Sequence, residues 1–571
     1  MHTRPESGFT NQSTSQVPHL PDAEVATGPN GQRAHRILLE HRRKVAPGPV
    51  PVRNDLFCLM GVCICNTQLI VTPNGVVVVD TGLSDRDGEA ILEWTARVSP
   101  LPIIAVVYTH SHYTFGTGPI LERYPGIPVI AHRRLHRNAV ASMVGPRRFM
   151  MRRANMESAR FLPPEGEDAD ATGSTIFTPG TLRYVRPTVE LTDEVQSMNI
   201  GGTDVVFHTT FPFDTNDTLM IWLPDQRAII HNHFASNFPN IYPIQGGRYR
   251  DPEPWLAGID RMRAYRPEHL LSTHGHPDTG EDRCLERLTA VRDALQFVHD
   301  QTIRGMNLHL TPDELVAFVQ LPDALHLHRD IQQTYGLVRN HVRGVFSGRA
   351  GWFDGDAATM DPPAPEQEAR HVIEAFGGFD AATRLMEAAL ERKEYQWAAR
   401  IGKWLLHLAP DNSSARSLQA TALRALGQRT TAWTVRNYYL SAARALEGTV
   451  TLTEPDYTLD LETAMQSPAG TFVRALAFRC NPALFPPRET TVGIGFRDPD
   501  FGCALVLRRG IAEYLPTRPK RVDCSIRCDR STWIRAADGI APFSNMVDNH
   551  NVELHPDRET VRAVLRAFDP E

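Results

Sequence analysis

The chain has 571 residues, with 60 Lys and Arg against 66 Asp and Glu, and a net charge of −6. This length predicts two to four domains. This charge balance excludes the strongly basic surface that would bind nucleic acid or an anionic membrane. It favours a small-molecule partner. Eight scattered cysteines, without a Cys-x-x-Cys pair, predict neither a disulfide framework nor a zinc ribbon and fit reduced thiols in the cytoplasm.

The N-terminal stretch, residues 1–50, is predicted to be a flexible arm. Its first part is rich in Ser, Thr, Gln, Gly and Pro, a composition that buries little apolar surface. It contains no apolar segment of the kind found in a signal peptide or a membrane span. We therefore expect no membrane span here and begin the folded part near residue 51.

Strand signals begin at residue 56. Apolar, β-branched runs at residues 56–64, 68–72 and 76–79 predict strands, and Pro73-Asn74-Gly75 between the last two predicts a hairpin turn. The third strand ends in Asp80-Thr81-Gly82. Residues 87–97 have the periodicity of an amphipathic helix, and residues 103–108 predict a buried strand.

The strand at residues 103–108 runs directly into His110 and His112. Because side chains alternate along an extended chain, His-x-His places both rings on one side. Neutral imidazoles are good ligands for zinc and iron. This stretch is the strongest signal of chemistry in the sequence.

Other predicted strands also end in polar side chains. Strands at residues 205–210 and 218–223 flank a loop with Asp217, the strand at 227–230 runs into His231 and His233, and the strand at 270–273 ends at His274. Loops at strand ends commonly carry catalytic residues. The set predicts a metal site where these loops meet.

The order of hairpin, strand ending in Asp, helix, and strand ending in His-x-His resembles the opening of the metallo-β-lactamase superfamily. The resemblance narrows at Tyr249-Arg250-Asp251, at residues 335–342 and at Gly-Trp-Phe-Asp-Gly (351–355), which look like the alkylsulfatase branch. That branch hydrolyses dodecyl sulfate and related esters. It implies an αββα sandwich with metals at the sheet edge, an all-α dimerisation domain and an α+β sterol-carrier-like C-terminal domain.

The resemblance gives a domain plan and an oligomeric state. We expect a flexible arm (1–50), a catalytic domain (51–360), a helical dimerisation domain (365–447) and a sterol-carrier-like domain (448–571). The Ala- and Leu-rich helical pattern between residues 379 and 446 supports the third of these. A homodimer is expected, because two-fold pairing is the commonest way to bury such apolar faces.

The metal ligands depart from the family pattern. Thr114 and Phe115 stand where the family has an Asp and a His that hold a second zinc. The resemblance implies that the bridging Glu falls at His233, with His231 as the alternative, and another Glu near Asp217. Since a neutral imidazole does not share two cations as a carboxylate does, this substitution favours one metal ion.

The predicted ligand set follows from this comparison: His110, His112, Asp217, His233 and His274. Zinc is the family default. A His-rich set with one carboxylate also matches mononuclear non-haem iron, which stays open as an alternative.

Substrate-handling positions also differ from the family. The family's sulfate-binding Arg corresponds to Gln245, and Arg250 is the candidate that takes over this role. Gln lacks the charge and the planar fork with which Arg matches an oxyanion. The family's general-acid His corresponds to Asn340, with His341 next to it, and Tyr335 opens the same segment. We therefore name Tyr335, Asn340 and His341 as candidate catalytic residues.

Two functions of different classes remain. The first is a metal-dependent hydrolase, divergent from the alkylsulfatases, that acts on an ester of an aliphatic small molecule and turns over dodecyl sulfate poorly. The second is a mononuclear iron redox or lyase enzyme on the same fold, in specialised metabolism. A binding protein with an impaired site is less compatible with five good ligands.

Overall fold

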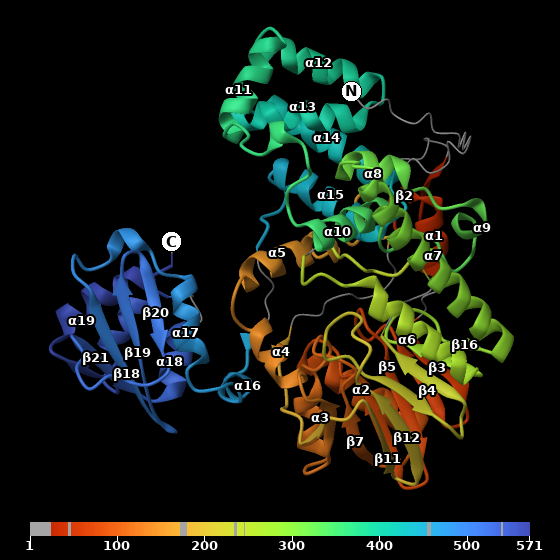
Figure 1. Cartoon of the computed structure of the whole chain (residues 1–571), viewed down its shortest axis with the longest axis horizontal. Helices are drawn as coiled ribbons and strands as arrows, with labels where there is room; N and C mark the ends of the chain where they lie inside the picture. The colour runs from red at the N-terminus through yellow and green to blue at the C-terminus, as the bar shows by residue number, and fades with distance from the viewer. Residues whose placement is uncertain are drawn as a thin grey trace.

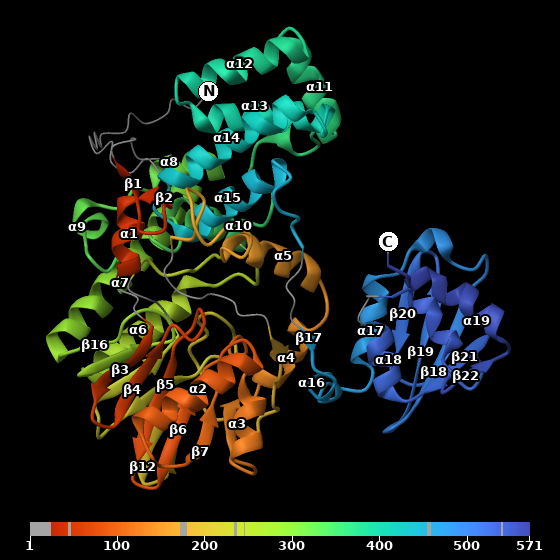
Figure 2. The same ribbon diagram turned by 180° about the vertical axis from the view of Figure 1, so that it is seen from behind.

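The computed structural model describes residues 24–43, 47–171, 180–232, 237–244, 246–453, 458–537 and 541–570. These residues form a two-sheet sandwich, a helical bundle at one end of it and a C-terminal module beside it (Figure 1). The view from behind (Figure 2) shows the same three parts, with α5 (Arg147–Glu157) between the sandwich and the bundle.

The first sheet has seven strands in the order β10-β8-β7-β6-β5-β4-β3. Neighbours from β3 to β6 run antiparallel, and those from β6 to β10 run parallel. Its central strands are runs of buried Val, Ile and Ala, residues that suit a sheet covered on both faces. The strands are β3 (Gly48–Arg53), β4 (Leu56–Met60), β5 (Thr67–Thr72), β6 (Gly75–Val79), β7 (Ile103–Val107), β8 (Val129–His132) and β10 (Val189–Leu191).

The second sheet has six strands in the order β11-β12-β13-β14-β15-β16. Its neighbours are antiparallel except for β14 and β15, which are parallel. The strands are β11 (Val195–Ile200), β12 (Thr203–His208), β13 (Met220–Leu223), β14 (Ala228–His231), β15 (His269–Ser272) and β16 (Asp278–Thr279).

The two sheets face each other across an apolar core that includes Val77, Val107, Phe207 and Ile221. Helices cover the outer faces, with Ile91 of α2 packed on the first sheet and Val291 of α7 in the core outside the second. The layer order is that of the predicted αββα sandwich, which is confirmed. The helices of this part are α2 (Asp85–Val98), α3 (Thr117–Arg123), α4 (Leu135–Ser142), α6 (Pro252–Tyr265), α7 (Glu281–Asn307), α8 (Pro312–Phe318), α9 (Asp323–His326) and α10 (Val338–Ala350).

One predicted strand was too long. The sequence predicted a strand over residues 56–64, whereas β4 ends at Met60. Gly61 has a φ of 79°, a left-handed conformation that leaves the strand, and a Cβ there would lie 2.9 Å from Cα of Pro47. The following residues therefore turn away from the sheet edge and carry Cys63 and Cys65 toward the site.

Part of the expected N-terminal arm is ordered. Residues 24–43 form β1 (Val25–Thr27), β2 (Arg33–His35) and α1 (Arg36–Arg43). The side chains of Ala34 and Leu38 are buried, and a buried Arg436 from the bundle donates to the backbone carbonyl of Arg33 at 3.0 Å. The prediction missed these elements because residues 1–50 are polar on average, although they include a short apolar segment around Ala34 and Leu38.

The helical bundle contains α11 (Pro365–Ala375), α12 (Phe379–Glu391), α13 (Tyr395–Leu408), α14 (Ser413–Arg429) and α15 (Trp433–Leu446). Its core is rich in Ala and Leu, including Ala382, Ala389 and Leu405. The bundle is tied to α5, because Asn437 and Ser441 of α15 donate to backbone carbonyls there at 2.9 and 3.1 Å. Helix α15 therefore packs directly against α5.

The C-terminal module is a five-stranded sheet in the order β20-β19-β18-β21-β22, packed on short helices. Trp533 and Ile534 face the core of the module from helix α18 (Arg530–Ala537). Its elements are β18 (Thr490–Arg497), β19 (Asp500–Arg508), β20 (Ile511–Leu515), β21 (Cys524–Cys528), β22 (Glu553–His555), α16 (Leu461–Met465), α17 (Thr471–Ala475), α18 (Arg530–Ala537) and α19 (Arg558–Leu565).

A short parallel pair joins this module to the sandwich: β17 (Thr458–Leu459) pairs with β9 (Thr181–Leu182). Thr463 of α16 adds a hydrogen bond from its hydroxyl to the carbonyl of Leu182 at 2.9 Å. In the part of the chain that the structure describes, no helix is both long and apolar enough to cross a membrane.

Candidate metal centre

The candidate site lies where the loops after β7, β12 and β15 converge. The loop after β7 carries His110 and His112, and the loop after β12 carries Asp214. The two loops are joined by a backbone hydrogen bond from Leu219 to the carbonyl of Thr109, at 2.7 Å. Within the described residues, His110, His112 and Asp214 form a group whose ligand atoms all lie within 4.8 Å of one another.

Asp80, at the end of β6, fixes the first histidine. Its buried carboxylate accepts hydrogen bonds from the backbone N–H and the hydroxyl of Thr109, at 2.8 and 2.7 Å. Burial raises the pKa of Asp80 to about 6, so the group is ionised at neutral pH. The Thr109 hydroxyl has only one hydrogen, and it donates that hydrogen to Asp80.

This hydrogen bond decides the tautomer of His110. Nδ1 of His110 lies 2.9 Å from Oγ1 of Thr109, and that oxygen has no hydrogen left to give, so we assign Nδ1–H as the donor. In the neutral ring Nε2 then carries a lone pair; burial would lower the pKa of His110, but Asp214 outweighs burial and raises it. Nε2 lies 3.3 Å from Oδ2 of Asp214 and has no partner of hydrogen-bond geometry within the described residues.

His112 and Arg250 complete the surroundings of Asp214. Nδ1 of His112 lies 2.7 Å from the same Oδ2, and the guanidinium of Arg250 pairs with Oδ1. Burial alone would raise the pKa of Asp214, but the guanidinium of Arg250 and the contacts with His112 and His110 outweigh burial and hold that pKa well below its usual range. The carboxylate is therefore ionised at neutral pH.

The arrangement fits a divalent metal ion. Two lone-pair atoms that face each other across 3.3 Å, Nε2 of His110 and Oδ2 of Asp214, repel unless a cation or a proton lies between them. Zinc bonds of about 2.0 to 2.1 Å at tetrahedral angles place two ligand atoms about 3.3 Å apart. Two imidazoles and one carboxylate also form a donor set known for zinc and for iron.

The predicted acid, Asp217, lies outside this group. Its Oδ1 accepts a hydrogen bond from the hydroxyl of Thr215, and its buried Oδ2 has no partner among the described residues. It is close enough to His110 to favour the charged form of that ring. The structure therefore brings Asp214, rather than Asp217, to the pair of histidines.

His274 is close to the group, but its ring nitrogens are engaged. Nδ1 lies 3.0 Å from the carbonyl of Ile64, and Nε2 lies 3.2 Å from the hydroxyl of Tyr113. Burial lowers the pKa of His274 to about 4, so the ring is neutral. His231, at the end of β14, is also buried, and burial lowers its pKa to about 3.

Two predicted residues, His233 and Gln245, lie outside the described residues. Their proposed roles, as a metal ligand and as a substrate contact, remain predictions. Arg250, the other predicted substrate contact, is occupied: besides its pair with Asp214, it donates to the carbonyl of Asn240 at 2.6 Å.

The three candidate catalytic residues lie on the bundle side of the site. His341, in the first turn of α10, is fully buried and stacks on Phe238 with ring centroids 5.0 Å apart. Burial lowers its pKa to about 3, and neither ring nitrogen has a hydrogen-bond partner in the described part of the chain. Tyr335 packs edge-on against Trp433 of α15 at 5.0 Å, and burial raises its pKa. Asn340 is half-buried.

Sequence reasoning missed the roles of Asp214, Asp80 and Tyr113. Asp214 and Asp217 stand three residues apart in one loop, so a signal existed, but no periodicity in a loop selects one over the other. Tyr113 gave no signal, because its partner His274 lies 161 positions further along the chain.

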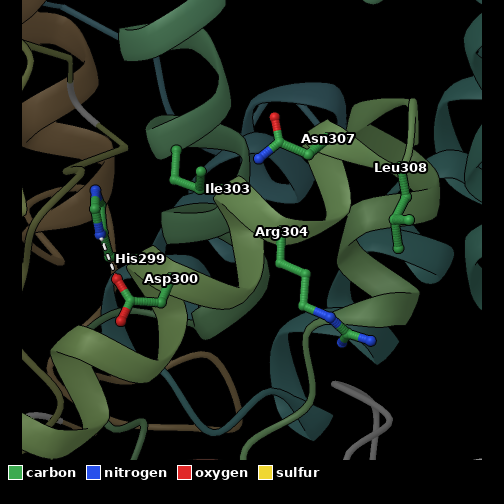
Figure 3. Close-up of a pocket in the computed structure, with 6 residues that line it drawn as sticks. All are labelled: His299, Asp300, Ile303, Arg304, Asn307 and Leu308. Carbon is green, nitrogen blue, oxygen red and sulfur yellow. Dashed lines mark hydrogen bonds and ion pairs between the residues drawn. The ribbon is translucent and has the colours of Figure 1, made fainter.

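A separate surface hollow runs along the end of α7. Figure 3 shows its lining, which comes from the last turns of α7 and from Leu308 directly after it. Arg349 donates to Nε2 of His299 at 3.1 Å, so Nδ1–H of that ring donates to Asp300 at 2.9 Å. Both nitrogens are thus used, and the hollow offers no group comparable to the histidine pair. Its residues are His299, Asp300, Ile303, Arg304, Asn307 and Leu308.

Two family descriptions match parts of the chain. The metallo-β-lactamase superfamily matches residues 60–230, which include His110, His112 and Asp214. The alkyl sulfatase dimerisation family matches residues 311–449, which cover the bundle.

Curated relatives and a solved structure point the same way. A linear primary-alkylsulfatase from Pseudomonas sp. (strain ATCC 19151) is 30% identical over 467 residues, covering 78% of this chain and 87% of the relative. An alkyl/aryl-sulfatase from Saccharomyces cerevisiae is 24% identical, over 91% of this chain and 82% of that one. The structure of a stereoselective inverting sec-alkylsulfatase from Pseudomonas sp. aligns with a TM-score of 0.86 and 25% identity, over 94% of this chain and 87% of that one.

These matches favour the hydrolase over the iron redox or lyase alternative, and the site retains the histidine pair that such a hydrolase needs to bind metal. The chain belongs to the alkylsulfatase branch of the metallo-β-lactamase superfamily and is an alkylsulfatase-like hydrolase.

Proposed function

We propose that the chain hydrolyses an ester of an aliphatic small molecule, with a single metal ion held by His110, His112 and Asp214. The observation that carries this proposal is the convergence of Nε2 of His110 and Nδ1 of His112 on one carboxylate oxygen. Thr114 and Phe115, which have no ligand atoms suited to a metal dication, follow the histidine pair and argue against a second ion.

Zinc is the proposed metal, with iron as the alternative. A bound dication would supply Lewis-acid chemistry, polarising the ester and lowering the pKa of water to near neutrality. The chain's own residues orient the ligands: Asp80 holds His110 through Thr109, and Arg250 holds Asp214. Such supporting contacts typically change metal affinity 10- to 100-fold.

The proposed substrate is less highly charged than an alkyl sulfate. A sulfate ester needs a cation for its free oxyanion, and Arg250 is already paired with Asp214 and with the carbonyl of Asn240. Gln245, which stands at the family's Arg position, offers only a neutral amide. Because charge-assisted contacts are about twice as strong as neutral ones, dodecyl sulfate should bind poorly.

Tyr335 is the proposed hydrogen-bond donor to the leaving group. Burial raises its pKa, so the phenol stays protonated at neutral pH and can donate a hydrogen bond there. His341, with a pKa lowered to about 3, is neutral and has no proton to give as an imidazolium. We assign His341 and Asn340 to the wall that positions Tyr335.

Two further proposals concern the assembly and its surroundings. We propose a homodimer formed through α11 to α15, since this region matches the alkyl sulfatase dimerisation family. The C-terminal module is proposed to be sterol-carrier-like and to recruit the aliphatic chain. Eight free cysteines support a reducing compartment such as the cytoplasm. Light scattering that gives a monomer mass at micromolar concentration would refute the dimer.

The test combines metal content and turnover. Protein purified without added metal should contain one zinc per chain by elemental analysis, and His110→Ala should be empty, while the exposed His371→Ala keeps its metal. The activity arm compares dodecyl acetate with dodecyl sulfate. We expect kcat/KM for the sulfate to be lower by about tenfold or more. Two ions per chain, or efficient sulfate turnover that His110→Ala abolishes, would refute the proposal.

A further inference from the structure

Tyr113 stands between the metal-binding histidines and His274. Its side chain is 7% exposed. Its ring meets the ring of His110 edge-on with centroids 5.1 Å apart, and that of His274 at 5.5 Å. Its hydroxyl lies 3.2 Å from Nε2 of His274. The hydroxyl therefore lies at the ring nitrogen with which His274 would bind an ion.

The hydrogen bonds around His274 fix its tautomer. The carbonyl of Ile64, 3.0 Å from Nδ1, accepts only, so Nδ1 carries the hydrogen. Nε2 of the neutral ring then has a lone pair, and the Tyr113 O–H donates to it. That lone pair is the one with which His274 would bind a metal.

We propose that Tyr113 is a positioning residue that withholds His274 from the metal and thereby limits the ligand set to His110, His112 and Asp214. The inference rests on the proposed one-metal centre. It changes the ligand set predicted from the sequence, in which His274 is a ligand, and it names the side chain that keeps this histidine out.

Both partners are held in place by their backbones. The carbonyl of Tyr113 accepts from the backbone N–H of Thr81 at 2.8 Å. On the other side, the side chain of Asn66 donates to the carbonyls of Ser272 and Gly275 at 3.0 and 2.7 Å, tying the His274 loop to the segment that carries Ile64. These contacts keep the hydroxyl of Tyr113 on Nε2 of His274, so freeing that nitrogen for an ion requires removal of the hydroxyl.

A purely structural role for Tyr113 predicts a different result. Cys63 and Cys65 pack against the ring, so Tyr113 also fills the core. Tyr113→Phe keeps the ring and this packing and removes only the O–H. If Tyr113 is only core, Tyr113→Phe leaves the metal affinity unchanged; if it caps His274, the freed lone pair becomes a ligand.

The experiment measures zinc affinity by competition with a chromophoric chelator in unmodified protein, Tyr113→Phe, His274→Ala and the double variant. We expect His274→Ala to match unmodified protein within threefold. Tyr113→Phe should bind zinc about tenfold tighter, and the double variant should lose that gain, which identifies His274 as its source. X-ray absorption should count one more imidazole on zinc in Tyr113→Phe than in unmodified protein.

Other outcomes distinguish failure of the role proposed for Tyr113 from failure of the proposed metal centre. If His274→Ala loses zinc as severely as His110→Ala does, Tyr113 does not withhold His274, although the proposed metal centre stands. The same conclusion follows if Tyr113→Phe leaves both the zinc affinity and the number of imidazole ligands unchanged. Full zinc occupancy in His110→Ala would instead overturn the proposed centre. If His274→Ala fails to fold, the imidazole count in Tyr113→Phe alone decides the question.

Discussion

Arg250 and Asp214 form an ion pair in which the guanidinium faces one carboxylate oxygen while the other oxygen faces His110 and His112. The side chain of Arg250 is 9% exposed, so this pair is shielded from water. The pair keeps Asp214 ionised and aims its free oxygen at the two imidazoles. An arginine that the sequence suggested for substrate binding thus orients a side chain of the proposed metal centre.

The first prediction tests this supporting role. Arg250→Met should weaken zinc binding about tenfold at pH 7.5, because Asp214 loses the contact that orients it. The variant should also lose zinc at a higher pH on acidification. Without the guanidinium the pKa of Asp214 rises, and protons compete with zinc for the carboxylate.

Arg248, an exposed neighbour, provides the matched control. Zinc titrations of Arg250→Met, Arg248→Met and unmodified protein at pH 5.5 and 7.5 make the comparison. If Arg248→Met and Arg250→Met behave alike, the effect is one of general charge and the supporting role of Arg250 is wrong.

The second prediction separates two acids of one loop. Asp214→Asn should lower zinc affinity about 100-fold, because a neutral amide replaces one of the three proposed ligands. Asp217→Asn should change it less than about threefold, since Asp217 lies outside the group of ligand atoms. Both substitutions keep the side-chain volume, and equilibrium dialysis with elemental analysis measures both. Equal losses would restore Asp217 as a ligand.

The sheets were predictable because they depend on local pattern. Runs such as Val76 to Val79 are apolar and β-branched, and Asn74-Gly75 selects a hairpin, so strand, turn and strand were read from neighbouring residues. Gly61 marks where this fails: whether an isolated glycine ends a strand depends on its φ, which the sequence does not give.

The site was predictable only in part, for a related reason. His110 and His112 follow a strong strand and therefore have a defined position. Asp214 sits in a loop in which no periodicity chooses between it and Asp217, and the bonds of Tyr113 and Arg250 join segments far apart in the chain. The sequence shows which residue types could bind a metal. Which of these side chains reach the site depends on contacts between distant segments, and those belong to the tertiary structure.

The third prediction concerns the cysteines. In native protein at pH 8, iodoacetamide should leave Cys58 and Cys65 unmodified, because both are buried and burial raises their thiol pKa, that of Cys58 to about 12. Cys480 is half-buried and should react slowly, as an internal comparison. In denaturing urea all eight cysteines should react. Rapid alkylation of Cys65 in native protein would contradict the packed arrangement around Tyr113.

The last prediction is a pH dependence of stability at His208. This ring ends β12, is 3% exposed and lies 2.7 Å from the hydroxyl of Tyr265. Burial lowers its pKa from 6.5 to about 4. The unfolded chain therefore binds a proton below pH 6.5 that the folded chain accepts only near pH 4, so acidification through this window destabilises the fold. At pH 5 this linkage amounts to about 2 kcal/mol.

His208→Gln removes the titrating group, and His371→Gln, at an exposed position, is its control. Thermal unfolding of the three proteins at pH 7.5 and pH 5 measures the effect. Unmodified protein and His371→Gln should lose more stability on acidification than His208→Gln does, because only they keep the buried imidazole that resists protonation. If all three proteins lose the same stability between the two pH values, His208 does not titrate in this window and its burial does not set the acid sensitivity of the sandwich.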